Sequence, residues 1–387
     1  MPSIKLNDNK PSLSLDSLTE KRRQRITPEM LKQFEYRDVS IEELLIFCSE
    51  NYCSDLYIKE GSEPYIYKSG FLMKVPCYPT SRDVWGEFQE KGHISNQEHN
   101  VYMTTLALDN SVRVRIPSTS PMYGVEGNTE FRYRANYSFS EDNRIATFRM
   151  ITVEDPTLDN LNFPDVCKEA LRKAYSSDAG IIYFTGPTGS GKTTTQTACF
   201  NTFTEPGSIL NDKVIIGLED PIEYQFKQRD NVKINQKELN QDFKDFAGGV
   251  KIALREHPDI ILIGECRDKP VINAAIEAAR TGHLVSTSFH ANDVGGTINR
   301  LCYHLENDTN LIYDLIINLK LIMSQRMIKG VGVDTQFMIF NDEITGRILE
   351  IVHSGKVIST EINNLFQEQD LIDRGLLKNW SMREVEN

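Results

Sequence analysis

A glycine-rich segment at residues 186–193, with the sequence GPTGSGKT, carries the clearest chemical signal in the 387-residue chain. It has the spacing of a P-loop and stands between the apolar run IIYFT and a predicted helix from Lys192 to about Phe203. Glycines let backbone N–H groups close around phosphates, and the N-terminus of a new helix favours negative charge. The pattern therefore predicts a nucleoside triphosphate site rather than an empty glycine-rich turn.

The residues of this loop divide into phosphate ligands and a metal ligand. Lys192 is expected to reach the β- and γ-phosphates, and the hydroxyl of Thr193 is expected to hold Mg²⁺. The other nucleotide contacts are expected from Gly186, Thr188, Gly189, Ser190, Gly191 and Thr194. ATP is thus the expected substrate and Mg²⁺ its expected cofactor.

Two further apolar runs end in acidic residues. The first leads into Glu219, Asp220 and Glu223, and carboxylates so close together are held more easily when a cation or a polarised water lies between them. They are candidates for metal binding or general-base catalysis, and the alternative is that they cap the next turn. The second run ends at Glu265 in the manner of a Walker B element, so this acid is expected to contact Mg²⁺ directly or through water.

Histidines flank a fourth apolar run, HLVSTSF. His283 and His290 are seven residues apart, so on a straight strand they face opposite sides and are expected to do different work. His290 stands at the carboxyl end, the edge at which parallel sheets bind ligands, and is interpreted as a sensor of the γ-phosphate. A purely structural role is the alternative for both histidines.

These residues require a sheet whose strands end at one edge. From residue 166 onward, near-continuous apolar runs alternate with helical segments, which predicts a parallel sheet covered by helices on both faces. One helix is well marked, with Asp268 as a plausible N-cap, Pro270 in the first turn and Gly282 at the end. The predicted fold class is α/β, with an ATPase domain over residues 166–387.

The chain before residue 166 has a different character. Residues 1–30 are polar without a sustained apolar period, which predicts a flexible extension. A helical pattern at 41–51 and short alternating runs predict a smaller α+β domain over 31–152. Residues 153–165 contain prolines and acids without periodicity, which predicts an interdomain linker.

Two of the alternating runs carry arginine on one face. In SVRVRIP these residues are Arg113 and Arg115, and in EFRYRAN they are Arg132 and Arg134. Such a face is either the solvated outer side of a sheet or a set of phosphate ligands presented across a subunit interface. The pattern alone leaves both interpretations open.

Composition limits the classes of partner. The net charge of -12 weighs against sequence-independent binding along DNA, and no apolar run approaches the ~18 residues of a membrane span. The seven cysteines are scattered without a C-x-x-C pair, which indicates reduced and mostly buried thiols. Because the N-terminus also lacks the pattern of a secretory signal, a cytosolic location is expected.

Together these elements resemble the PilT-type family of secretion and pilus-retraction ATPases. The resemblance is carried by GPTGSGKTTT (186–195), LEDPIEY (218–224), ALREHPDIILIGECRD (253–268), AARTGHLVSTSFHAN (278–292) and SQRM (324–327). The N-terminal half resembles the family more loosely, at CSDLYIKEG (53–61) and FRYRANYSF (131–139).

The resemblance implies roles for the residues that match the family's motifs. Glu223 would be the catalytic base, Glu265 the acid that coordinates Mg²⁺ and His290 the γ-phosphate sensor. The arginine fingers presented to a neighbouring subunit would be Arg132, Arg134 and Arg149.

The resemblance also implies an assembly. Family members are hexameric rings in which a PAS-like N-terminal domain rests on a RecA-like ATPase domain. The implied location is the cytoplasmic face of the inner membrane, where partner proteins of a secretion or pilus complex would hold the ring. Direct sequence-specific binding of nucleic acid is not expected.

Several features separate branches of this family. The tetracysteine zinc motif of pilus-assembly and type II secretion ATPases is absent from the sequence. The long polar leader and the divergent segment after Gly330 favour the DotB and TraJ type, which serves type IVB secretion and conjugation. The alternatives are a pilus-retraction motor, a nucleic-acid translocase on a RecA-like core, and a nucleotide-binding scaffold that does not hydrolyse.

Overall fold

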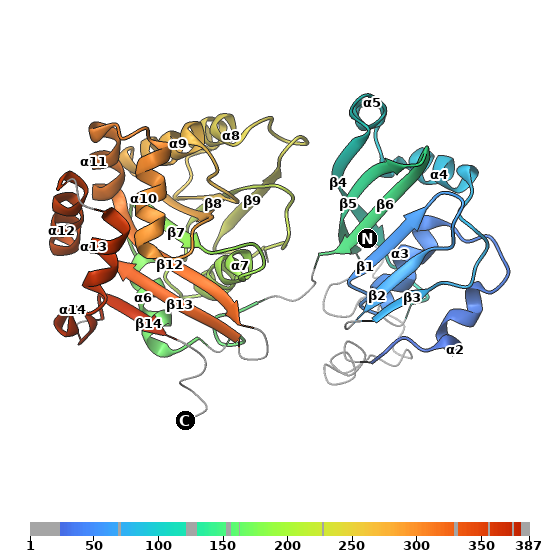
Figure 1. The fold of residues 1–387 in the computed structure, drawn as a ribbon, viewed down its shortest axis with the longest axis horizontal. Helices are drawn as coiled ribbons and strands as arrows, with labels where there is room; N and C mark the ends of the chain where they lie inside the picture. Colours follow the sequence, from blue (N-terminus) through green and yellow to red (C-terminus); the bar gives the residue numbers. More distant parts are fainter. Residues whose placement is uncertain are drawn as a thin grey trace, which may run out of the picture. The chain divides into compact units, whose positions relative to one another are not determined.

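A computed structural model describes residues 24–68, 71–120, 130–151, 156–161, 163–226, 228–328, 332–354, 357–373 and 375–380. The chain divides into two units, Met1–Val153 and Glu154–Asn387, and each has its own hydrophobic core. Figure 1 shows the strands and helices of both units. None of the helices in the described ranges combines the length and the apolar character that a bilayer crossing requires.

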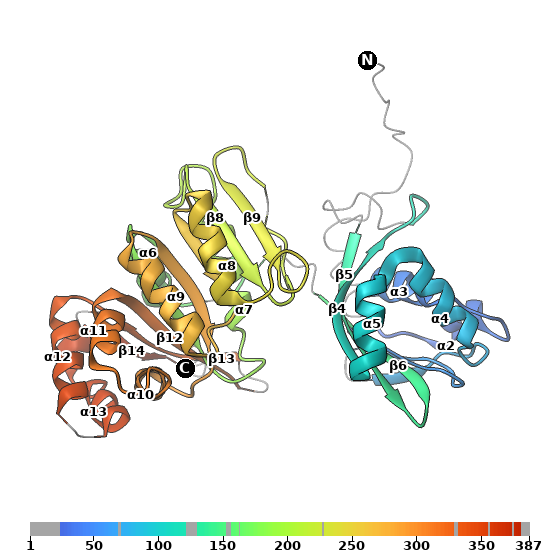
Figure 2. The same cartoon turned by 90° about the horizontal axis from the view of Figure 1, so that it is seen from above.

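The described residues of the first unit include a six-stranded antiparallel sheet with the order β3-β2-β1-β6-β5-β4. Its strands are β1 (Asp55–Lys59), β2 (Tyr65–Lys68), β3 (Phe71–Lys74), β4 (Ala107–Arg115), β5 (Glu130–Ser140) and β6 (Asn143–Met150). Its helices are α2 (Pro28–Leu31), η1 (Lys32–Phe34), α3 (Ile41–Glu50), α4 (Arg82–Phe88), η2 (Gln89–His93) and α5 (Asn96–Thr105). Figure 2 shows α3, α4 and α5 on one face of this sheet.

Alternating side chains determine which face of this sheet is buried. Phe131 and Tyr133 of β5 are fully buried, as the period-2 pattern predicts. On the opposite face Arg134 is exposed, whereas only 7% of Arg132 is exposed. The two arginines of this strand therefore have different surroundings, although they share a face.

Side chains begin to pack into the core of the first unit at Ile26, earlier in the chain than the polar composition indicates. Ile26 is only 6% exposed, and it belongs to the same core as Leu31. Helix α2 begins at Pro28 with Thr27 as its N-cap, so residues 26–30 are folded rather than part of the predicted flexible extension. Two or three apolar side chains are enough to pack a short polar segment against a domain. Residues 1–23 lie outside the described ranges.

The described residues of the second unit form an eight-stranded sheet with the order β14-β13-β12-β7-β11-β10-β8-β9. The strands β12, β7, β11, β10, β8 and β9 pair with one another in parallel. The pairings of β13 with β12 and of β14 with β13 are antiparallel. The strands of this sheet are β7 (Gly180–Thr185), β8 (Val214–Glu219), β9 (Lys233–Glu238), β10 (Ile260–Ile263), β11 (Leu284–Phe289), β12 (Leu319–Ile328), β13 (Gly332–Ile339) and β14 (Leu377–Trp380).

Helices lie on both faces of this sheet, as Figures 1 and 2 show. They are α6 (Asp165–Tyr175), α7 (Lys192–Phe203), α8 (Phe246–Ala253), η4 (Leu254–Glu256), α9 (Lys269–Arg280), α10 (Val294–His304), α11 (Thr309–Asn318), α12 (Asp342–His353), α13 (Ile358–Leu365) and α14 (Gln369–Asp373). Strands β7, β10 and β11 are buried along their whole length, which is typical of parallel strands covered on both sides. The predicted α/β fold class is confirmed.

The described part of the predicted linker packs into the second unit. Leu158 and Phe163 are 2% and 5% exposed and belong to the core of that unit. The backbone N–H of Leu158 donates to Thr202 Oγ1 at 3.0 Å, and Asn201 Nδ2 donates to the carbonyl of Pro156 at 3.0 Å. Since both partners belong to α7, the backbone at Pro156 and Leu158 is bound to the helix that begins at the P-loop.

Candidate active site

The P-loop joins the carboxyl end of β7 to the first turn of α7. Gly186 has φ +147°, and a Cβ there would lie 2.2 Å from the carbonyl oxygen of Gln325 and 2.6 Å from Ser190 Oγ. Gly191 caps α7 in the left-handed region, at φ +89°. Gly186 leaves room that a side chain would fill, and both positions have backbone angles that favour glycine, so the loop can close tightly around a ligand.

Lys192 lies at the base of this loop. It is 8% exposed, and its ammonium donates to the carbonyls of Gly186 at 2.9 Å and Pro187 at 3.0 Å. Burial lowers the pKa of Lys192, and the charges of Glu265 and Glu223 act in the opposite direction. Both acids are therefore close enough to Lys192 to act on its charge.

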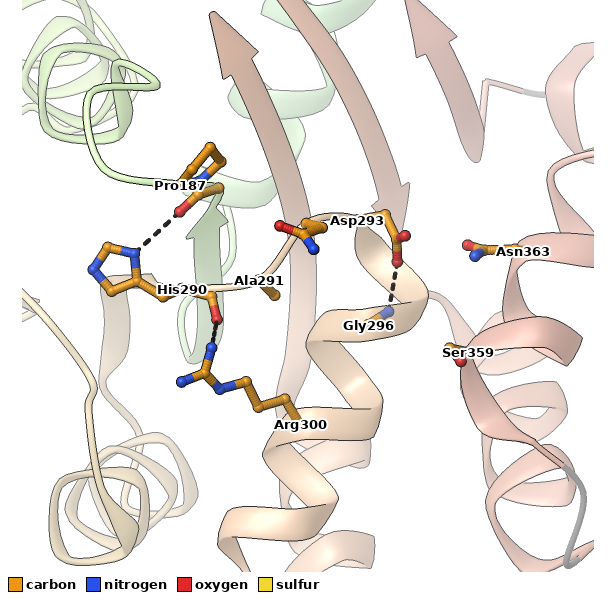
Figure 3. Close-up of a pocket in the computed structure, with 10 residues that line it drawn as sticks. Pro187, His290, Ala291, Asp293, Gly296, Arg300, Ser359 and Asn363 are labelled. Carbon is orange, nitrogen blue, oxygen red and sulfur yellow. Dashed lines mark hydrogen bonds between the residues drawn. The ribbon is translucent and has the colours of Figure 1, made fainter.

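Glu265 follows β10 and connects two side chains. Its Oε1 lies 3.0 Å from His290 Nε2, and its Oε2 lies 2.7 Å from Arg267 Nη2. The other ring nitrogen of His290, Nδ1, lies 3.2 Å from the carbonyl oxygen of Gly186. Figure 3 shows the imidazole directed at the P-loop. Lys192 and His290 thus meet at one carbonyl, and Glu265 lies on the far side of the imidazole ring.

Glu223 projects from the loop that follows β8. It is exposed, whereas Ile222 and Phe226 on either side of it are each 6% exposed. The hydroxyl of Tyr224 lies 3.1 Å from Thr194 Oγ1 in the first turn of α7. The sequence therefore folds this loop so that an exposed carboxylate stands beside a residue tied to the P-loop helix.

The other two acids of this segment differ in exposure. Glu219 is 6% exposed, and its Oε1 accepts a hydrogen bond from Gln236 Nε2 at 2.8 Å. Asp220 is exposed and is joined to Pro221 by a cis peptide bond. The two neighbouring acids therefore differ in exposure, because Glu219 is buried against β9 and Asp220 lies at the surface.

The described residues fit a nucleotide with Mg²⁺. Ser190 Oγ is buried and has no hydrogen-bond partner within the described ranges, as expected of a loop shaped for phosphate. The same ranges contain no cluster of three His, Cys, Asp or Glu side chains that would hold a metal by itself. Mg²⁺ in nucleotide sites takes one or two carboxylates together with phosphate oxygens, and Glu265 and Thr193 would supply the protein's share.

The structure does not bring every candidate to this edge of the sheet. His283 precedes β11, at the opposite edge, and its Nδ1 lies 3.1 Å from the carbonyl of Ala278 and 3.2 Å from Thr281 Oγ1. It therefore holds the end of α9 and lies apart from the P-loop. The candidate arginine fingers Arg132, Arg134 and Arg149 belong to β5 and β6 of the first unit.

Sequence reasoning did not single out three residues that contact the site. Arg267 binds Glu265, and Arg300 donates to the carbonyl of His290 at 2.7 Å. Gln325 Nε2 donates to Thr195 Oγ1 at 2.8 Å. Gln325 and Arg267 lie in the segments 324–327 and 253–268 that resemble the family, where neither residue has an implied role, whereas Arg300 lies outside these segments.

A cavity of about 390 Å³ adjoins His290 and the P-loop. Figure 3 shows that its lining comes from the P-loop, the turn before α10, α10 itself and α13. Asp293 Oδ1 accepts a hydrogen bond from the N–H of Gly296 at 2.6 Å, which caps α10 on the cavity wall. The cavity thus extends the site from the P-loop toward the C-terminal helices.

Comparison with known proteins assigns this arrangement to a family. The profile of the type II/IV secretion system protein family matches residues 108–358. The chain belongs to this family. One relative is the type IV pilus retraction ATPase PilT of Pseudomonas aeruginosa. The two sequences are 29% identical over 303 residues, which cover 76% of this chain and 79% of that protein.

Solved structures of related proteins show the same fold. The structure of the ATPase DotB from Legionella pneumophila matches with a TM-score of 0.72 and 23% identity, over 89% of this chain and 95% of that chain. The structure of the pilus retraction motor PilT with bound ADP matches with a TM-score of 0.70 and 28% identity, over 85% and 90%. The fold of this chain is therefore found both in the ATPase DotB and in a pilus retraction motor.

Proposed function

We propose that this protein hydrolyses Mg-ATP and converts the resulting domain motion into mechanical work on a bacterial type IV secretion apparatus, of the type IVB or conjugal-transfer kind. One observation carries the proposal: Lys192 and His290 meet at the carbonyl of Gly186, and Glu265 lies 3.0 Å from His290. Three neighbouring parallel strands, β7, β10 and β11, lead into Lys192, Glu265 and His290. A P-loop lysine and a Walker B acid are recurring parts of sites for phosphoryl transfer.

Each side chain has a separate task in this mechanism. Lys192 leaves its two loop carbonyls to bind the β- and γ-phosphates, and His290 contacts the γ-phosphate and reports its presence. Glu223 accepts a proton from the attacking water. Glu265 and Thr193 would hold Mg²⁺, which would supply positive charge to the phosphates. Backbone N–H groups from Thr188 to Thr194 surround the phosphates.

We propose that the active form is a homohexamer in which arginines complete a neighbour's site. Arg134 of β5 and Arg149 of β6 are directly paired in the sheet, and like charges so placed repel each other. Arg149 is held by Asp55 through Nε and Oδ1 at 2.8 Å, yet 70% of its side chain is exposed. An exposed arginine pair suits an anion such as a neighbour's triphosphate, and Arg132 is the third candidate.

We propose that partner proteins bring the ring to the cytoplasmic face of the inner membrane. The polar leader and the divergent segment after Gly330 support a type IVB or conjugation machine. The sequence similarity to PilT of Pseudomonas aeruginosa supports the alternative, a type IV pilus retraction motor. Co-purification from the native cell distinguishes them, because the first yields secretion-channel or coupling proteins and the second yields a pilus platform protein.

Phosphate release from the purified chain tests the hydrolytic step. Wild type is expected to release phosphate from ATP only with Mg²⁺, and Glu223→Gln is expected to bind nucleotide but stop turnover. A wild-type protein that binds Mg-ATP without turnover would instead indicate a nucleotide-binding scaffold. Stimulation of turnover several-fold by added DNA would favour a translocase.

Mixing of inactive variants tests the ring. Arg134→Ala and Lys192→Ala are each expected to be inactive alone. Mixed hexamers are expected to recover activity, because some sites then receive an intact arginine and an intact P-loop from different subunits. Failure of every mixing ratio to recover activity would count against arginines that act across the interface.

A further inference from the structure

Gln236 lies on β9, the polar edge strand beside β8, where it pairs with Gly217. Its Nε2 donates to the carbonyl oxygen of Tyr224 at 2.7 Å and to Glu219 Oε1 at 2.8 Å. Its Oε1 accepts a hydrogen bond from the backbone N–H of Phe226 at 3.0 Å. A primary amide has two N–H donors and one carbonyl oxygen, so this side chain uses each of them to hold its surroundings.

These contacts involve the backbone on either side of Glu223 and not Glu223 itself. On the C-terminal side of Glu223, Gln236 holds the Tyr224 carbonyl and the Phe226 N–H. On its N-terminal side, the backbone N–H of Ile222 donates to Glu238 Oε2 at 3.3 Å. The backbone is therefore held on both sides of an exposed carboxylate, which limits where that carboxylate can move.

The same loop is connected to the P-loop helix. Tyr224, whose carbonyl Gln236 binds, places its hydroxyl 3.1 Å from Thr194 Oγ1. The ring of Phe226 packs against Phe200 of α7, with ring centroids 5.2 Å apart. Gln236 thus holds, from the side of the sheet, the loop that sets the distance between Glu223 and a bound triphosphate.

Gly217 supplies a second observation. A glycine inside a buried strand is unfavourable, and the φ of Gly217 lies outside the left-handed region that requires glycine. A Cβ at this position would lie 3.1 Å from Glu219 Oε1 and 3.3 Å from Gln236 Cγ. The glycine leaves the space in which the Glu219 and Gln236 side chains meet.

We propose that Gln236 is a positioning residue, which holds the loop of Glu223 at the distance from the triphosphate that activation of water requires. The inference rests on the proposed hydrolysis of ATP. Glu219 then orients Gln236, and its carboxylate supports the loop instead of binding metal.

Gln236→Glu tests this role. It keeps the shape of the side chain but replaces the NH₂ group, with its two donors, by an oxygen that only accepts hydrogen bonds. The new carboxylate would face the Glu219 carboxylate and the Tyr224 carbonyl, so the loop is expected to move away. Displacement of a catalytic group by about 1 Å costs on the order of 100-fold in rate, so kcat is expected to fall at least about tenfold. Affinity for a fluorescent ATP analogue with Mg²⁺ is expected to stay within about threefold, because Gln236 makes no contact with the P-loop itself.

Gln225→Glu is the matched control. Gln225 is exposed in the same loop, next to Tyr224, and this variant adds the same charge near Glu223 without touching the Gln236 contacts. Its turnover is expected to match wild type. The double variant Glu219→Gln/Gln236→Glu returns a donor to the pair and is expected to recover part of the lost kcat.

Two results would overturn the proposal. One is a folded Gln236→Glu protein with wild-type turnover. The other is a Gln236→Glu protein whose nucleotide affinity falls by the same factor as its kcat. If the single variant does not fold, the double variant decides by the same split between kcat and affinity. A wild-type protein without ATP turnover would refute the proposed function instead, so the two failures are distinguishable.

Discussion

Replacement of Lys192 by methionine is expected to weaken phosphate binding and to leave the fold unchanged. Methionine keeps the length and the apolar stem of lysine but removes the ammonium, which is buried at the base of the P-loop. Hydrogen bonds that involve a charged group contribute about 1.5–3 kcal/mol net, and about 1.4 kcal/mol corresponds to a tenfold change in Kd. The Kd for Mg-ATP is therefore expected to rise about 10- to 150-fold. The lower part of this range is favoured because the ammonium gives up the Gly186 and Pro187 carbonyls when ATP binds.

Titration with a fluorescent ATP analogue in the presence of Mg²⁺ measures this change. Lys213→Met is the control, because Lys213 precedes β8 at the opposite edge of the sheet and pairs with Asp259 at 3.1 Å. Its Kd is expected to stay within about twofold of wild type. A Lys192→Met protein that binds the analogue as tightly as the control does would refute the assignment of Lys192 to the phosphates.

Three further outcomes follow from the structure. Glu265→Gln is expected to keep nucleotide affinity within about threefold while phosphate release falls at least about 100-fold, and an equal loss of both would contradict its role. Leu158→Ala is expected to lower the free energy of unfolding by about 2–4 kcal/mol in denaturant titrations, because Leu158 is buried; a change below about 0.5 kcal/mol would show that it lies in a loose linker. All seven cysteines are buried, and burial raises the pKa of Cys266 to about 12 and that of Cys302 to about 11. Ellman's reagent at about pH 8 is therefore expected to modify fewer than about one thiol per folded chain, and rapid modification of several thiols would count against this packing.

The strands that carry chemistry were predictable because their signal is local. The runs that became β7, β8, β10 and β11 are mostly apolar and almost entirely buried, and each is followed by glycine, an acid or histidine where the parallel sheet places its ligand edge. Helix α9 has Asp268 as its N-cap, and that side chain accepts a hydrogen bond from the N–H of Val271 as the sequence indicated.

Other elements were missed because their reasons are not local. Strand β9 has the sequence KINQKE, which is too polar for a typical buried strand, and its Gln236 and Glu238 are explained only by the loop that they hold. The proline- and acid-containing segment near Leu158 looks like a free linker until α7 is seen to bind its backbone. Strand β12 joins the sheet by pairing with β7, and β14 joins it by pairing with β13 after three intervening helices, and no short pattern reveals pairings between residues so far apart.

The contacts of Arg267 were missed for a similar reason. Two residues after Glu265, it looks like an ordinary surface arginine, and 61% of its side chain is exposed. Its importance follows only from the 2.7 Å contact between its Nη2 and Glu265 Oε2. Spacing in the sequence cannot show which way a surface side chain turns.

The central claim is that Lys192, Glu223, Glu265 and His290 act on one triphosphate. A structure of the full chain with Mg²⁺ and a non-hydrolysable ATP analogue tests it most directly. We predict that the γ-phosphate lies within about 3.5 Å of Lys192 Nζ and of the His290 ring, with Mg²⁺ between Thr193 and Glu265. A triphosphate bound away from the P-loop, or one that Lys192 does not contact, would contradict the account.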